Sequence, residues 1–167
     1  MKKLNNRMDG KIMELFATPF PFDDFFLYVS NHVSVDKTLG VMGILSPKFL
    51  EVDGCIMWEN VESIDYSKGR QKFTDATVKE REYYYNLFCI EDFFQVGEEV
   101  SDCVSETVEE GWRKYMDLKL AFARQIERYW RFALSECYPD KRFEFEISEK
   151  GIWPEDGACL TFWQVNE

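Results

Sequence analysis

Residues 104–138 read VSETVEEGWRKYMDLKLAFARQIERYWRFALSECY and contain the longest helical pattern of the chain. Their apolar positions recur mostly in steps of three, four or seven, which is the spacing of one face of an α-helix, and Pro139 ends the run. A single helix over 103–137 would be about 50 Å long, which exceeds the diameter of a small domain. We therefore expect a long helix with a break or bend at Gly111, because glycine is unfavourable in a helix interior. The apolar face is defined by Val108, Trp112, Tyr115, Phe122, Ile126, Tyr129, Trp130, Ala133 and Cys137.

The segment that follows this helix alternates with a period of two. Phe143, Phe145 and Ile147 would point to one face of a strand, and the intervening glutamates to the other. Residues 151–157 are rich in turn-forming residues, and 158–165 have the composition of a second strand. The C-terminus is therefore predicted to close as a β-hairpin.

A second hairpin is predicted upstream of the long helix. Asp53-Gly54 separates two strand-like runs, 49–52 and 55–58. An Asp-Gly pair between such runs favours a two-residue type I′ turn, in which both central residues have positive φ. Whether the two hairpins belong to one sheet is left open by the sequence pattern.

Two shorter helices are also predicted. The segment 77–80 reads Thr-Val-Lys-Glu, which matches a capping box at the start of a helix over about 78–90. Asp23 or Asp24 could cap a short helix that starts at Phe25. Together these elements predict one α+β domain over 1–167, with an N-terminal helical region and a long C-terminal-half helix packed on antiparallel sheet made of β-hairpins.

Composition limits the classes of protein to which the chain can belong. Of its 167 residues, 46% are hydrophobic and 17% aromatic, which predicts a folded body despite the net charge of −11. This charge disfavours nucleic-acid binding, because phosphate contacts need clustered Lys and Arg. No segment is apolar and long enough for a bilayer, so we predict no membrane association. The five cysteines are scattered and form no C-x-x-C, which predicts reduced thiols and a cytoplasmic location.

The sequence has no recognisable catalytic or metal-binding motif. His32 is the only histidine, and its place at an expected helix end predicts a role in satisfying carbonyl groups there. Cys89 lies beside acidic residues, which disfavour the reactive thiolate, so we expect it in the core. We therefore predict neither a catalytic residue, nor a metal site, nor a cofactor.

One acidic block is the main candidate for function. Between Glu91 and Glu110 the chain carries eight acidic residues and no Lys or Arg. Such a block can steer a basic partner toward the surface, although a solvated face would have the same composition. Trp153, which precedes a proline in a predicted loop, is the other candidate, because tryptophan is enriched at interface hot spots. The predicted partner-binding residues are Glu98, Glu99, Asp102, Glu106, Glu109 and Trp153.

These observations predict a non-enzymatic cytoplasmic binding protein whose acidic surface engages a basic protein partner. In size, charge and lack of catalytic motifs the chain resembles the small acidic immunity proteins that neutralise bacterial toxins. This resemblance implies an inhibitor-like role and carries no residue assignment. The alternative is a small-molecule-binding protein or a weakly signalled enzyme, with an aromatic-lined pocket that has Asp23, Asp24 or Glu91 as its polar groups.

Overall fold

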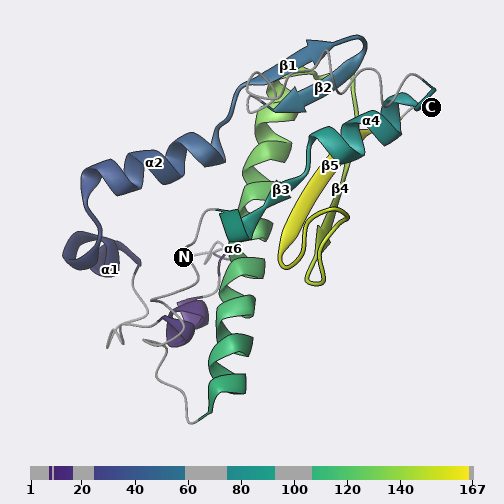
Figure 1. Cartoon of the computed structure of the whole chain (residues 1–167). Coiled ribbons are helices and arrows are strands. Elements are labelled where there is room, and N and C mark those ends of the chain that lie inside the picture. The colour runs from purple at the N-terminus through teal and green to yellow at the C-terminus, as the bar shows by residue number, and fades with distance from the viewer. Residues whose placement is uncertain (1–7, 9, 17–24, 59–74, 93–106, 166–167) are drawn as a thin grey trace, which may run out of the picture.

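The helix α6 spans Val108–Cys137 and forms the long axis of the molecule (Figure 1). A computed structural model describes residues 8, 10–16, 25–58, 75–92 and 107–165 of the chain. In order, the other elements are η1 (Gly10–Leu15), α1 (Phe25–His32), α2 (Val35–Leu45), β1 (Phe49–Val52), β2 (Cys55–Trp58), α4 (Val78–Tyr85), β3 (Phe88–Cys89), η3 (Ile90–Asp92), β4 (Phe143–Ser148) and β5 (Cys159–Gln164).

The α6 helix continues through Gly111, so the predicted break or bend there is wrong. The helix also begins later than the apolar pattern indicated, which places Gly111 near its start. Thr107 and Glu110 form a capping box, in which the threonine hydroxyl accepts from Glu110 N and the glutamate accepts from Thr107 N, both at 3.2 Å. Gly111 thus lies in the first turn, where its N–H donates to Thr107 O at 3.1 Å. The helix is about 45 Å long at its 30 residues.

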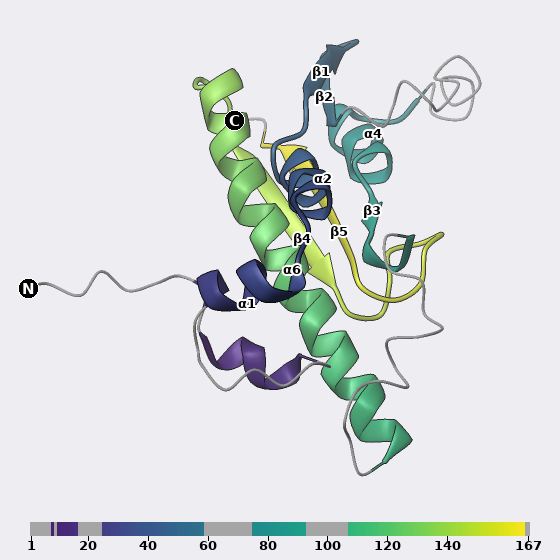
Figure 2. The same ribbon diagram turned by 90° about the vertical axis from the view of Figure 1, so that its left-hand side faces the viewer.

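The α6 helix packs against a three-stranded antiparallel sheet with the strand order β3-β5-β4. Figure 2 shows α6 running along one side of β4 and β5. Trp130 is fully buried and meets Phe162 of β5 and Phe88 of β3 edge to face, with ring centroids 5.9 and 5.6 Å apart. Its indole N–H also donates to Ile44 O at 2.8 Å, which holds the end of α2 against α6. Trp130 is therefore the centre of the main core.

The predicted hairpins are both present, and they belong to separate sheets. The β1 and β2 strands pair in a two-stranded sheet, and the φ angles of Asp53 and Gly54 are 51° and 76°, as the type I′ turn requires. The β4 and β5 strands pair antiparallel over six residues, with Phe143 opposite Gln164. The α+β class and the long helix on antiparallel strands are confirmed.

The α4 helix has the predicted capping box but ends sooner than expected. Thr77 and Glu80 bond reciprocally, and the helix stops at Tyr85 rather than near 90. The side chain of Asn86, which follows, bonds to the backbone of β2 and β5. Phe88 and Cys89 then pair with β5, so strand pairing overrides the helical pattern.

The N-terminal helical region extends away from the sheets (Figure 1). The α1 helix starts at Phe25 as predicted, whereas its proposed caps Asp23 and Asp24 lie outside the described residues. Neither α1 nor α2 contains a fully buried residue. In the described parts of the chain, no helix is both long and apolar enough to span a membrane.

Candidate functional site

The structure describes only part of the acidic block. Glu98, Glu99, Asp102 and Glu106 lie outside the described residues, so their predicted role is untested. Glu109 is exposed in the first turn of α6.

Two other acidic residues of the block have structural roles. Glu110 caps α6, and Glu91 forms an ion pair with the buried Lys119 of the same helix. The sequence alone therefore does not distinguish acidic residues that are engaged within the fold, such as Glu91 and Glu110, from those that are exposed to solvent.

Trp153 lies at the tip of the loop between β4 and β5, with 80% of its surface exposed. The tip is closed by a hydrogen bond of 2.8 Å from Glu155 N to Ile152 O. Ile152 is buried against Cys89 and Cys159, which anchors the loop to the sheet. The structure thus presents Trp153 to solvent on a well-supported turn.

Trp153 is the outermost member of an aromatic row, defined as Trp153, Tyr84, Tyr83 and Trp163. Consecutive ring centroids are 6.3, 5.4 and 5.5 Å apart. Exposure falls along the row from 80% at Trp153 and 38% at Tyr84 to 9% at Trp163. One end of the aromatic row is therefore fixed in the body of the protein, and the other is open to contact.

Carboxylates adjoin the aromatic row. Glu146 of β4 is exposed and accepts a hydrogen bond from Tyr83 Oη at 3.2 Å. Burial, followed by the Glu146 charge, raises the pKa of the Tyr83 hydroxyl, which keeps it a hydrogen-bond donor. Glu155 is exposed two residues from Trp153. Lys79 adds a positive charge over the buried end, with Nζ 4.6 Å from the Trp163 centroid.

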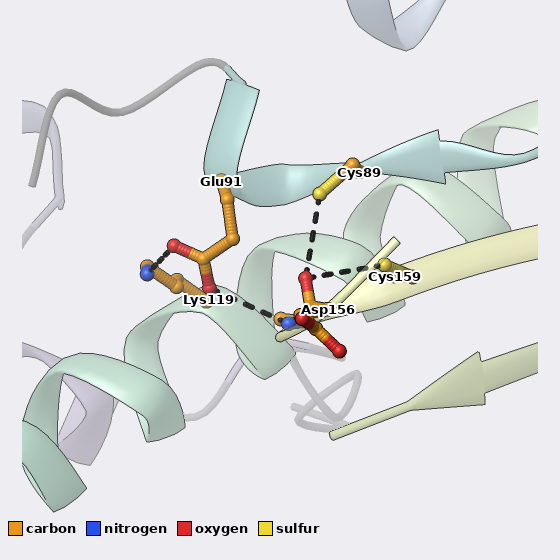
Figure 3. Close-up of polar contacts among 6 residues, drawn as sticks. Cys89, Glu91, Lys119, Asp156 and Cys159 are labelled. Carbon is orange, nitrogen blue, oxygen red and sulfur yellow. Dashed lines mark hydrogen bonds and ion pairs between the residues drawn. The ribbon is translucent and has the colours of Figure 1, made fainter. Parts of the chain in front are cut away.

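A partly buried polar cluster attaches the Trp153 loop to α6 (Figure 3). Lys119 has 3% of its side chain exposed, and its Nζ contacts Glu91 Oε2 while lying 4.0 Å from the Tyr115 ring centroid. The other Glu91 oxygen accepts from Ala158 N at 3.4 Å, where the loop enters β5. Gly157 has a φ of +82°, and a Cβ there would be 2.5 Å from Glu91 Oε1. Glycine is thus needed for the close approach.

A second ion pair connects the loop to the first turns of α6. Arg113 Nη1 contacts Glu149 Oε1 at 3.0 Å, and its Nε lies 3.5 Å from Asp117 Oδ1. Glu109 is one turn before Arg113, and Glu149 is four residues before Trp153. The structure therefore brings the described members of the predicted site, Glu109 and Trp153, to neighbouring elements.

Sequence reasoning missed the polar residues that join the two sheets. Glu82 of α4 is fully buried and accepts from Ile56 N and Gln164 N, both at 2.6 Å. Asn86 accepts from Trp58 N at 3.2 Å and donates to Ile56 O and Phe162 O. Their spacing of four residues places Glu82 of α4 and the C-cap residue Asn86 on the same side of the helix axis, but they look like ordinary polar helix residues in the sequence.

The side chains of Glu82 and Asn86 are hydrogen-bonded to other groups of the same chain, which favours a structural role over a catalytic one. Burial raises the pKa of Glu82, and the hydrogen bonds from Ile56 and Gln164 oppose this effect.

His32 is exposed at the end of α1, with its ring 4.9 Å from that of Tyr28. Among the described residues, no group of three or more His, Cys, Asp and Glu side chains is arranged to hold a metal ion.

Comparison of the chain with protein-family models, with curated proteins and with solved structures found no match.

Proposed function

We propose that this is a non-enzymatic, cytoplasmic binding protein that engages a basic protein partner. The observation that carries the proposal is the exposed Trp153, which stands at the open end of the aromatic row beside exposed carboxylates. An exposed tryptophan on a supported surface can become buried against a partner, and such residues dominate binding energy at interfaces.

The chemistry of this surface favours a partner rich in Lys and Arg. Trp153 and Tyr84 are exposed aromatic side chains of the kind that attract cations, and the exposed Glu146 and Glu155 carry carboxylates for ion pairs. The acidic block, with the exposed Glu109 at its edge, would add long-range attraction. The net charge of −11 makes nucleic acid an unsuitable ligand for the same surface.

The alternative function, a small-molecule-binding protein or weakly signalled enzyme with an aromatic-lined pocket, has less support. Glu91, one of the polar groups expected to line such a pocket, is already bound by Lys119 and Ala158 N. Asp23 and Asp24 lie outside the described residues. The cytoplasmic location in this proposal rests on the sequence, in which the five cysteines are scattered and form no C-x-x-C.

The test uses the full chain as bait in an extract of its native cells, at low and high salt. Trp153→Ala and the double variant Glu146→Lys/Glu155→Lys should each lose the captured basic protein. Phe132→Ala and Glu136→Lys/Asp140→Lys are matched controls, because these exposed residues lie near the other end of α6.

Direct binding of the identified partner to each purified variant then decides the proposal. We expect Trp153→Ala to weaken the affinity at least tenfold, as loss of a hot-spot residue does. Equal affinities for Trp153→Ala and Phe132→Ala would mean that the aromatic row is not the binding surface.

A further inference from the structure

Cys89 and Cys159 face each other across the β3 and β5 strands. Both are buried, with exposures of 6% and 0%. Their Sγ atoms lie 3.7 and 3.8 Å from the same acceptor, the backbone carbonyl of Asp156, and Figure 3 shows the two thiols converging on it. Residues 70 positions apart in the sequence thus form a dithiol that no sequence spacing indicated.

The strand register places Cys89 and Cys159 where a disulfide can join them. Ile90 N donates to Ala158 O at 2.9 Å, which makes Ile90 and Ala158 a hydrogen-bonded pair. Because such pairs alternate along an antiparallel ladder, Cys89 and Cys159 occupy a non-hydrogen-bonded position, where Cα atoms are about 4.5 Å apart. Disulfides span Cα separations from about 4.4 to 6.8 Å, so a bond needs little backbone movement.

We propose that Cys89 and Cys159 are an oxidisable pair. A small peroxide is the oxidant, and the product is an intramolecular cross-strand disulfide between the two residues. The acidic neighbours of Cys89 were expected to disfavour its thiolate, but one of them, Glu91, is paired with Lys119. In the first step the sulfur of Cys89, the more exposed of the two residues, attacks hydrogen peroxide, breaks its O–O bond and releases one water, which leaves a sulfenic acid. In the second step Cys159 Sγ attacks the Cys89 sulfur and the S–O bond breaks. The departing hydroxide takes the Cys159 proton as a second water, so two thiols are oxidised and one peroxide is reduced.

The surroundings explain why Cys159 acts second. Burial, followed by the neighbouring Cys89, raises the pKa of Cys159 to about 12, which keeps it a thiol at neutral pH. The described cysteines Cys55 and Cys137 lie on other elements: Cys55 is on β2, and Cys137 is exposed at the end of α6.

The test treats the full-length, reduced protein with hydrogen peroxide and follows three readouts. The intact mass should fall by two hydrogen atoms, and the thiols titrated in denaturant should fall from five to three, because one disulfide consumes two. Peptide mapping without reductant should recover Cys89 linked to Cys159, and reductant should restore all thiols.

Single variants locate the bond. Cys89→Ala and Cys159→Ala should abolish the mass loss, whereas Cys55→Ala, Cys103→Ala and Cys137→Ala should retain it. Peptide mapping of the wild type keeps the proposal testable if a buried variant fails to fold. Retention of five thiols, a different linkage, or addition of oxygen without a disulfide would each overturn the proposal.

Discussion

Glu82 accepts two hydrogen bonds from Gln164, one from its backbone N–H at 2.6 Å and one from its side-chain amide at 2.9 Å. A third bond comes from Ile56 N of β2. The two sheets therefore meet through a helix side chain rather than through a shared strand ladder. This arrangement places a fully buried carboxylate where three donors depend on it.

Replacement of Glu82 by glutamine should destabilise the protein. The new amide group directs N–H bonds toward backbone N–H groups of Ile56 or Gln164, so buried donors lose their acceptor. We expect the free energy of unfolding to fall by about 1–3 kcal/mol in denaturant titrations. The same change at the exposed Glu144 should cost under about 0.5 kcal/mol. Equal effects at both sites would contradict the bridging role of Glu82.

The contribution of Glu82 to stability should decrease as pH rises. Its folded pKa lies above its ordinary value of 4.5, so between those two values the folded state binds more protons than the unfolded state. The free energy of unfolding of the wild type minus that of Glu82→Gln should therefore fall as the pH is raised from 4.5 through the raised folded pKa. Unfolding curves for both proteins across this range measure the difference, and a difference that grows with pH would refute the prediction.

Asn86→Asp should be more damaging than its small change in shape indicates. Asn86 Nδ2 donates to Ile56 O at 2.8 Å and to Phe162 O at 3.1 Å, so aspartate would place a buried carboxylate oxygen against two carbonyls. We expect a loss of about 3 kcal/mol or more at neutral pH. Asn31→Asp, at an exposed position on α1, should cost under about 1 kcal/mol. Thermal unfolding of both variants compares them, and similar losses would argue against the Asn86 bridge.

The ion pair between Glu91 and Lys119 should show strong energetic coupling. Lys119→Met removes the buried cation and leaves Glu91 hydrogen-bonded to Ala158 N, which should cost about 3 kcal/mol of unfolding free energy. Glu91→Gln in the Lys119→Met background should cost less than it does in the wild type, with a coupling of about 1–3 kcal/mol in a double-mutant cycle. Lys150→Met, at an exposed site, is the control. Additive effects would mean that the pair contributes nothing.

The acidic block should act mainly on the rate of association with a basic partner. The quadruple replacement of Glu98, Glu99, Glu106 and Glu109 by glutamine should slow binding several-fold at low salt, because it removes charges that attract the basic partner. The effect should be smaller at physiological salt, where such attraction is screened over about 8 Å. Stability should change little.

The matched control for this quadruple variant removes the same charge elsewhere, at the exposed residues Glu14, Asp36, Glu136 and Asp140. On-rates for both variants at two salt concentrations measure the effect. Equal on-rates for the wild type and the acidic-block variant at low salt would mean that the block is only a solvated face.

The outcome for Trp153 illustrates how far sequence reasoning reached at the candidate site. Its exposure followed from a proline-containing loop, and the structure confirms it. Its contact with Tyr84 could not be predicted, because the two residues are far apart in the chain and meet only when β5 brings the loop to α4. Likewise, the charge pattern did not separate Glu91, which pairs with Lys119, from the exposed Glu109.

Local patterns in the sequence determined the long helix, the two hairpins and the capped α4, because each depends on periodicity or turn chemistry within a few residues. Tertiary structure alone decided where α4 ended, that the hairpins form separate sheets, and which polar side chains became buried. Glu82 and Asn86 bond to strands more than 25 residues away in either direction. Such bonds leave no local signal, since their partners are backbone groups that every residue carries.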